Sequence, residues 1–175
     1  YSEELEKGYR NILVIGVDAR DNESLAETGT NADVMMIVSI NNETKDIKLV
    51  SVYRDTYLKM ADGNKEYEKA NYQMSVGYAE DVMNMLNMNL DLNIEEYVIV
   101  NWSAVAKAVD LLGGVDNVEI TQELLDKGQI DGYITSVVEN TGIPGVQLKV
   151  PGTYTLSGVQ AVAYCRVRYV GYDYG

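Results

Sequence analysis

The stretch DVMMIVSINNETKDIKLVSVYRD, residues 33–55, contains two apolar runs rich in β-branched residues and joined by a polar segment. This pattern predicts a β-hairpin. We expect residues 41–45 to form its turn, because asparagine tolerates the backbone angles that turns require. Both runs are too apolar for one face to contact water, so we expect the hairpin to be central in a covered sheet.

The register of this hairpin brings charged residues together at its open end. If Ile40 lies opposite Asp46, counting along antiparallel strands places Asp33 opposite Tyr53. Arg54 is then one step beyond, and about 5 Å separates the two strands. Asp33, at the start of the first strand, is therefore expected to lie near Arg54, at the end of the second strand.

A second strand is predicted before the hairpin. Residues 11–17, NILVIGV, form a short apolar run that is typical of a buried strand and ends at Asp18. If this strand is antiparallel to the first strand of the hairpin, its end lies at the same sheet edge as Asp33. We therefore expect Asp18, Asp33 and Arg54 to converge there.

Strands and helices alternate along the rest of the chain. Ser103 is expected to cap one helix that Gly113 and Gly114 end, and Ser157 with Gln160 fits a capping box. The further expected strands are 95–101 and 117–120, and the expected helices are 70–88, 103–112, 121–128, 128–142 and 157–165. The alternation predicts an α/β fold, a three-layer α/β/α sandwich with a central mixed β-sheet. Residues 1–10 are expected to be a lead-in segment and residues 11–175 a single domain.

Composition excludes several classes of function. The net charge of −13 argues against nucleic acid, which requires a basic face. The absence of histidine removes Ser-His-Asp and Cys-His catalysis and histidine-ligated metals. One cysteine, without a CxxC motif, excludes a disulfide framework and a cysteine zinc site. The sequence contains no run of about 18 apolar residues, so we expect no segment of it to span a membrane. Any catalysis or metal binding must therefore depend on carboxylates and arginines.

The arginines are candidate phosphate ligands. The chain has five of them, Arg10, Arg20, Arg54, Arg166 and Arg168. The last two are two residues apart, so in an extended segment both point to one side. The planar guanidinium binds phosphate oxygens through two N–H groups at once, which lysine cannot do. The alternative, which spacing alone favours, is that each arginine pairs with a carboxylate for structural reasons.

Asp18 and Asp33 are candidate Mg²⁺ ligands. Two carboxylates at one sheet edge suit this ion, which keeps several waters and takes substrate phosphates as its remaining ligands. The alternative is that each aspartate caps a turn.

Several motifs, in order, resemble the LytR-CpsA-Psr family, also called cell envelope-related transcriptional attenuator domains. The resemblance covers about residues 11–175 and rests on GVDAR, NADVMMIVSI, SVYRDTYL, VDLLGGV and LSGVQAVAYCRVRY, with Asp173 after the last. It implies an extracellular phosphotransferase of the bacterial cell envelope. Such enzymes move a glycopolymer, such as teichoic acid or capsule, from an undecaprenyl pyrophosphate carrier to peptidoglycan. The resemblance also implies Mg²⁺ and an apolar tunnel for the lipid between sheet and helices.

The resemblance assigns roles to individual residues. Asp18 and Asp33 match the acids near the metal, and Asp173 matches a proposed base for the acceptor hydroxyl. The residues that match pyrophosphate-binding arginines are Arg20, Arg54, Arg166 and Arg168, and Arg54 also counts as catalytic.

Three features depart from the family pattern, and the start of the chain is a separate observation. Asn31 stands where arginine is usual, so one phosphate contact is expected to be missing or supplied elsewhere. Tyr53 replaces a usual proline. The pattern continues with an arginine and a glutamine beyond Gly175, so we expect these 175 residues to fold but to catalyse poorly. The chain opens at Tyr1 and not at Met, and we expect a preceding segment that carried a membrane anchor.

Two alternative functions stay open. One is a regulatory module that binds a polyprenyl phosphate lipid without turnover, which Asn31 favours slightly. The other is a metal-dependent lipid pyrophosphatase, which differs only in using water as the acceptor.

Overall fold

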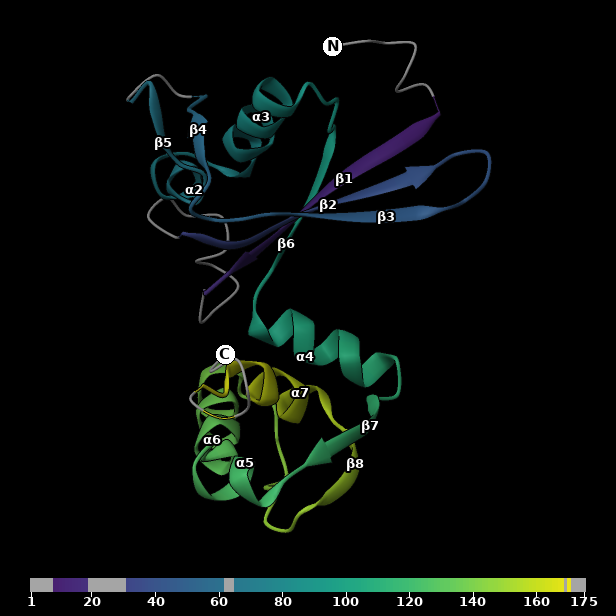
Figure 1. The fold of residues 1–175 in the computed structure, drawn as a ribbon, viewed down its shortest axis with the longest axis vertical. Helices are drawn as coiled ribbons and strands as arrows, with labels where there is room; N and C mark the ends of the chain where they lie inside the picture. The colour runs from purple at the N-terminus through teal and green to yellow at the C-terminus, as the bar shows by residue number, and fades with distance from the viewer. Residues whose placement is uncertain (1–7, 19–30, 62–64, 169, 171–175) are drawn as a thin grey trace. The chain divides into compact units, whose positions relative to one another are not determined.

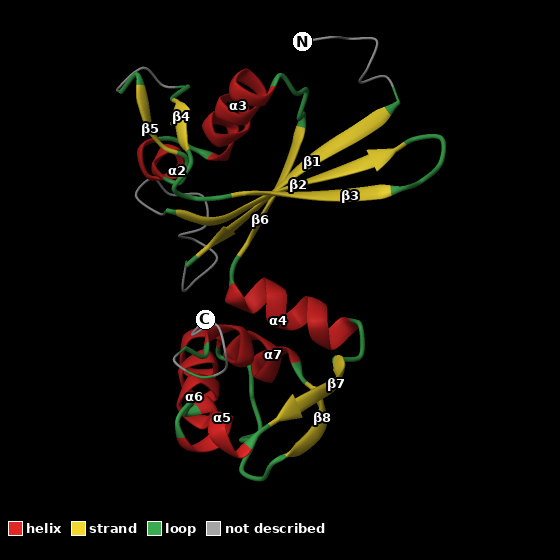
Figure 2. Ribbon diagram, viewed as in Figure 1, coloured by secondary structure: helices red, strands yellow, loops and turns green. Residues whose placement is uncertain are grey.

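The computed structural model describes residues 8–18, 31–61, 65–168 and 170. These residues form two compact units, 1–101 and 102–175, and each unit is described below by itself. Figure 1 shows the elements and Figure 2 their classes. The prediction of a mixed α/β fold with a central mixed sheet is confirmed.

The first unit is built on a mixed sheet with the strand order β3-β2-β1-β6. Strand β1 is antiparallel to β2 and parallel to β6, and β2 is antiparallel to β3. Its elements are β1 (Tyr9–Val17), β2 (Ala32–Asn41), β3 (Ile47–Val52), β4 (Tyr57–Lys59), β5 (Tyr67–Lys69), α2 (Tyr72–Val76), α3 (Ala79–Leu90) and β6 (Glu96–Val100).

One face of this sheet forms the core of the first unit with helices α2 and α3. Alternate residues of β1 and β2 are buried on that face, as the period of two in a strand requires. The core side chains from the sheet are Leu13, Ile15, Val17, Ala32, Met35 and Ile37, and those from the helices include Met74, Ala79, Val82, Met85 and Leu86.

The hairpin is present, but two details of its prediction are wrong. The turn is shorter, because Asn41 belongs to β2 and its N–H donates to the carbonyl of Asp46. Ile40 therefore pairs with Ile47, and the register moves by one residue. The Asn41 side chain explains this turn, since its Oδ1 accepts hydrogen bonds from the N–H groups of Glu43 and Thr44.

The hairpin is also not central as a whole. Strand β2 lies between two neighbours, but β3 is an edge strand and is largely exposed. Leu49 is 63% exposed, and Val34 on the same sheet face is 50% exposed. The expectation of a hairpin covered on both faces is therefore wrong for β3.

The helix predicted over residues 70–88 is two helices. They are separated at Gly77, where the backbone is extended. In the first turn of α3, the carboxylate of Asp81 accepts a hydrogen bond from the N–H of Tyr78, the N-cap residue. A Cβ on Gly77 would lie 2.4 Å from Oδ2 of Asp81, so a larger residue here would displace this carboxylate.

The second unit combines four helices with a two-stranded sheet in its described part. Its elements are α4 (Trp102–Leu111), β7 (Val115–Ile120), α5 (Gln122–Asp126), α6 (Ile130–Thr141), β8 (Gly152–Leu156) and α7 (Gly158–Arg166). Helix α4 begins at Trp102, so Ser103 lies in its first turn and is not its N-cap. Both glycines after α4 have positive φ, which confirms the predicted stop. The capping box of Ser157 and Gln160 is confirmed at α7.

Among the described residues, the buried cores of the two units have no residue in common. Its buried side chains include Ala106, Ile120, Ile130, Ile134, Val137, Leu148, Leu156, Val159, Val162 and Ala163. The prediction of one domain over residues 11–175 stays a prediction.

Candidate functional site

In the first unit, charged side chains gather where β1 ends and β2 begins. Val17 pairs with Ala32 and Gly16 pairs with Val34, so Asp33 is the extra residue of a β-bulge. A bulge bends the strand and redirects a side chain. Asp18 follows the last residue of β1 directly and is exposed. The two aspartates therefore lie at one edge of the sheet, as the strand order in the sequence suggested.

Arg54 lies in the turn after β3 and binds Asp33. Its Nη1 donates to Oδ1 of Asp33 over 2.9 Å, and its backbone carbonyl accepts from the N–H of Asn71. The one-residue shift in register explains this contact, because continuing the pairing of Met35 with Val52 places Arg54, and not Tyr53, opposite Asp33. The side chains of the pair are 55% and 45% exposed, so the pair adds little to stability.

A second carboxylate extends this group of charges. Arg54 Nε lies 3.8 Å from Oδ2 of Asp55, and Lys69 Nζ lies 2.7 Å from Oδ1 of the same residue. The hydrogen bond and charge of Lys69, together with the smaller effect of Arg54, lower the pKa of Asp55. The lowered pKa favours the ionised form of this carboxylate. In this group, the negative side chains of Asp33 and Asp55 therefore alternate with the positive side chains of Arg54 and Lys69.

The described arginines differ in their partners. Arg10 pairs with Glu96 on the neighbouring strand, with its Nε 3.0 Å from Oε1, and Arg54 pairs with Asp33. Among the described residues, no carboxylate lies within ion-pair distance of Arg166 or Arg168. Arg10 thus fits the structural interpretation, and the last two arginines fit a site that binds an anion.

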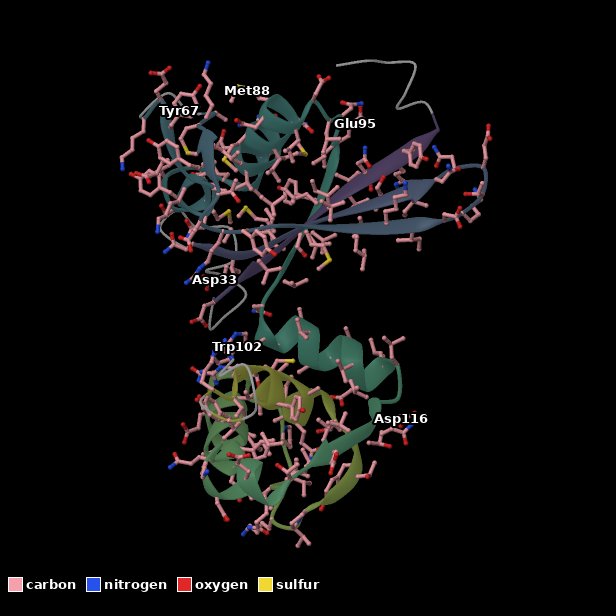
Figure 3. All side chains as sticks on the ribbon, viewed as in Figure 1. Asp33, Tyr67, Met88, Glu95, Trp102 and Asp116 are labelled. Carbon is pink, nitrogen blue, oxygen red and sulfur yellow. The ribbon has the colours of Figure 1, made fainter. Side chains whose placement is uncertain are left out.

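Arg166 and Arg168 lie on either side of buried Val167 in the second unit. Arg166 is the last residue of α7, so the premise of one extended segment is wrong for it. Its Nη1 donates to Oγ of Ser136, and its guanidinium lies over the ring of Trp102. Figure 3 labels Trp102. Arg168 is exposed, and its Nη1 donates to the backbone carbonyls of Cys165 and Val167. Sequence reasoning missed Trp102 and Ser136, because nothing in the spacing relates them to an arginine so far along the chain.

The remaining candidates lie outside the described residues, and these are Arg20 and Asp173. The described residues contain no group of three or more carboxylate or cysteine side chains that could hold a metal ion by themselves. Mg²⁺ needs only one or two carboxylates when substrate phosphates supply other ligands. Asp18 and Asp33 have the right donor type, and in the described part of the chain only one of the two carboxylate oxygens of Asp33, Oδ1, accepts from Arg54.

No helix in the described ranges is both long and apolar enough to cross a membrane.

Comparison with curated proteins gives one relative with a regulatory name and others that are named as transferases. Biofilm regulatory protein A of Streptococcus mutans is 28% identical over 165 residues, which cover 91% of this chain and 38% of the relative. Polyisoprenyl-teichoic acid–peptidoglycan teichoic acid transferase TagU of Bacillus subtilis is 28% identical over 158 residues, covering 90% of this chain and 44% of the relative. The chain therefore spans less than half the length of these two relatives.

Comparison with solved structures gives proteins of the same kind as the transferase relatives. TagT bound to LI-WTA has a TM-score of 0.63 and 26% identity, and the similarity covers 97% of this chain and 59% of that chain. The LytR-CPS2A-psr family protein YwtF (TagT) with bound octaprenyl pyrophosphate lipid has a TM-score of 0.61 and 25% identity, with 96% and 60% covered. The LytR_cpsA_psr family model matches residues 2–175, nearly the whole sequence. The chain belongs to the LytR_cpsA_psr family.

Proposed function

We propose that this chain is the transferase domain of a protein that moves a glycopolymer from a polyprenyl pyrophosphate carrier to peptidoglycan. The observation that carries the proposal is the environment of Arg166 and Arg168, which have neutral partners among the described residues of a chain with a net charge of −13. The names of the transferase relatives and the bound octaprenyl pyrophosphate lipid of YwtF (TagT) support the same chemistry. The names of these relatives support a location in the cell envelope. The outer face of the cytoplasmic membrane is the location that we propose within it.

In the proposed reaction, a hydroxyl of peptidoglycan attacks the phosphorus that carries the glycan. The bond from that phosphorus to the bridging oxygen of the pyrophosphate breaks, and polyprenyl phosphate leaves with the electron pair. The hydroxyl proton passes to the carboxylate of Asp173. Phosphoryl transfer depends on positioning and on neutralising charge more than on a covalent nucleophile, so a site without histidine suffices.

The arginines would supply that positioning. The planar guanidinium of Arg54 offers five N–H groups, of which Asp33 takes one. Arg20, Arg166 and Arg168 are the further proposed ligands of the pyrophosphate oxygens. Asp18 and Asp33 would hold Mg²⁺, which neutralises charge on the phosphates when it is bound.

Product analysis tests the proposal against its two alternatives. The chain is incubated with a polyprenyl pyrophosphate-linked glycan and Mg²⁺, with and without peptidoglycan. Transfer predicts a glycan phosphate linked to peptidoglycan. Release of free glycan phosphate without an acceptor would identify a pyrophosphatase, and binding without any product would identify a regulatory module.

The proposed metal site has its own test. Asp18→Ala and Asp33→Ala should each remove most transfer activity while the protein stays folded, and EDTA should do the same until Mg²⁺ is restored. Asp46→Ala is the control, because Asp46 lies at the other end of the same hairpin. Full activity in EDTA would contradict the metal role.

A further inference from the structure

Arg166 packs against aromatic rings in place of a carboxylate. Its Cζ lies 3.8 Å from the centre of the Trp102 ring and 5.5 Å from that of Tyr133. Its Nη1 donates to Oγ of Ser136 over 3.3 Å. These three partners come from α4 and α6, and all of them belong to the second unit. We call Trp102, Tyr133 and Ser136 the Arg166 cage.

The cage leaves donors free on the guanidinium. An aromatic ring at the distance of Trp102 covers a flat face of the cation, and the N–H groups point outward in the plane. Ser136 takes one of the five N–H groups. The neutral rings and hydroxyl do not neutralise the positive charge, as the carboxylate of Glu96 does for Arg10.

We propose that Trp102, Tyr133 and Ser136 are positioning residues that hold the Arg166 guanidinium ready for two in-plane hydrogen bonds to a phosphate group. The inference rests on the proposed function, because it takes the pyrophosphate of the lipid carrier as the anion. A flexible arginine loses side-chain entropy when it binds a ligand, and a guanidinium that is already fixed loses less. The cage therefore increases affinity without contacting the ligand.

A purely structural role makes a different prediction. Arg166 ends α7, where a positive charge stabilises the helix dipole, so the cage could serve only to stabilise this helix end. In that case, changes in the cage would lower the melting temperature and leave the affinity for phosphate unchanged.

The first experiment examines the cage without a ligand. Trp102 is the single tryptophan of the chain, so its emission reports on its own surroundings. Arg166→Gln should change the emission maximum, because it removes the cation from the indole ring. Arg168→Gln should leave the maximum unchanged. An unchanged spectrum in Arg166→Gln would overturn the cage itself, whatever the chain does with phosphate.

The second experiment measures the affinity for inorganic pyrophosphate by calorimetry, in the presence of Mg²⁺, on the 175-residue chain. Trp102→Leu should weaken binding about threefold to tenfold, and Trp102→Phe should retain most of the affinity because it keeps a ring. In the Arg166→Gln background, Trp102→Leu should have no further effect. Lys107→Gln is the control, because it removes a positive charge from α4 at an exposed position outside the cage.

The outcomes separate the two proposals. Equal weakening by Trp102→Leu in both backgrounds would overturn the positioning role, and so would unchanged affinity with a lowered melting temperature. If the original chain binds no pyrophosphate while Arg166→Gln still changes the emission, the proposed function fails and the positioning role fails with it, but the packing of Arg166 against Trp102 stands.

Discussion

Arg54 and Asp33 show how single residues prepare the proposed site. The ion pair is exposed, so it contributes about 0–1 kcal/mol to stability. Its value lies in orientation, because the bulge at Asp33 and the turn after β3 hold the two side chains against each other. A phosphate oxygen could replace the Asp33 contact at little cost in free energy.

At this scale we predict that Arg54→Lys impairs transfer severely. Lysine has a single ammonium group in place of the planar guanidinium, which can donate two parallel hydrogen bonds to phosphate. The loss of one charge-assisted hydrogen bond to phosphate costs about 1.5–3 kcal/mol, or about tenfold to a hundredfold in rate. The free energy of unfolding in urea should change by less than about 1 kcal/mol. Arg10→Lys is the matched control. Arg10 is also paired with a carboxylate, but it lies at the start of β1, whereas the proposed site lies where β1 ends. Near-normal turnover by Arg54→Lys would count against a phosphate contact.

At the scale of elements, the helices of the second unit are fixed by close contacts as much as by their caps. Helix α7 begins at Gly158, whose N–H donates to Oδ1 of Asp110 in α4. A Cβ on Gly158 would lie 1.9 Å from the carbonyl oxygen of Ala106. The two helices can approach this closely only because the residue has no side chain.

Two helical glycines provide a matched prediction. Gly158→Ala should destabilise the protein by at least about 1–3 kcal/mol, because the new methyl group overlaps the α4 backbone. Gly132→Ala, in α6, should stabilise it by about 0.5–1 kcal/mol, because nothing lies within 4 Å of the added Cβ and alanine favours a helix. Both values come from thermal or urea unfolding. Equal effects of the two substitutions would contradict the close contact of α4 with α7.

A hydrogen bond between β6 and α3 gives a prediction about pH. The hydroxyl of Tyr97 donates to Oε1 of Glu80 over 2.7 Å, which lowers the pKa of Glu80 and raises the pKa of Tyr97. The contribution of Glu80 to stability is therefore present above its unfolded pKa and is lost as the pH falls through its folded pKa. The contribution of Tyr97 is present below its unfolded pKa and is lost as the pH rises through its folded pKa.

Tyr97→Phe should raise the pKa of Glu80 toward its ordinary range, because the main cause of the shift is removed. Carboxyl chemical shifts followed by NMR through an acid titration measure this change. The pKa of Glu96, which Arg10 lowers, serves as an internal control and should stay unchanged. An unchanged Glu80 pKa would show that Tyr97 does not make this bond in solution.

At the scale of the whole molecule, the net charge of −13 determines which large partners are possible. Neutralising the phosphates of DNA requires a basic surface that releases counterions. One curated relative, from Streptococcus mutans, carries a regulatory name. The charge of this chain therefore argues against a nucleic-acid partner.

We therefore predict that the chain does not bind double-stranded DNA. The anisotropy of a labelled duplex at physiological salt should not change at protein concentrations up to about 100 µM, where non-specific DNA-binding proteins occupy about half or more of the duplex. Binding that weakens linearly with the logarithm of the salt concentration would contradict this expectation.

The sequence by itself determined the features that depend on neighbouring residues. These are the apolar strand over residues 11–17, the existence of the hairpin over residues 33–55, the stop at Gly113 and Gly114 and the capping box at Ser157. Each follows from local periodicity or from backbone preferences, which a short window of sequence contains. The mixed α/β class follows from the alternation of predicted strands and helices along the chain.

Only the tertiary structure decided the details that join distant residues. The side-chain bonds of Asn41 set the turn and moved the register by one, which placed Arg54 opposite Asp33. The strand order left β3 exposed at an edge, although its composition is that of a buried strand. Arg166 gained Trp102 as a neighbour only because α4 and α7 pack together. Such contacts depend on how elements that are far apart in the sequence pack together, and no short sequence pattern determines that packing.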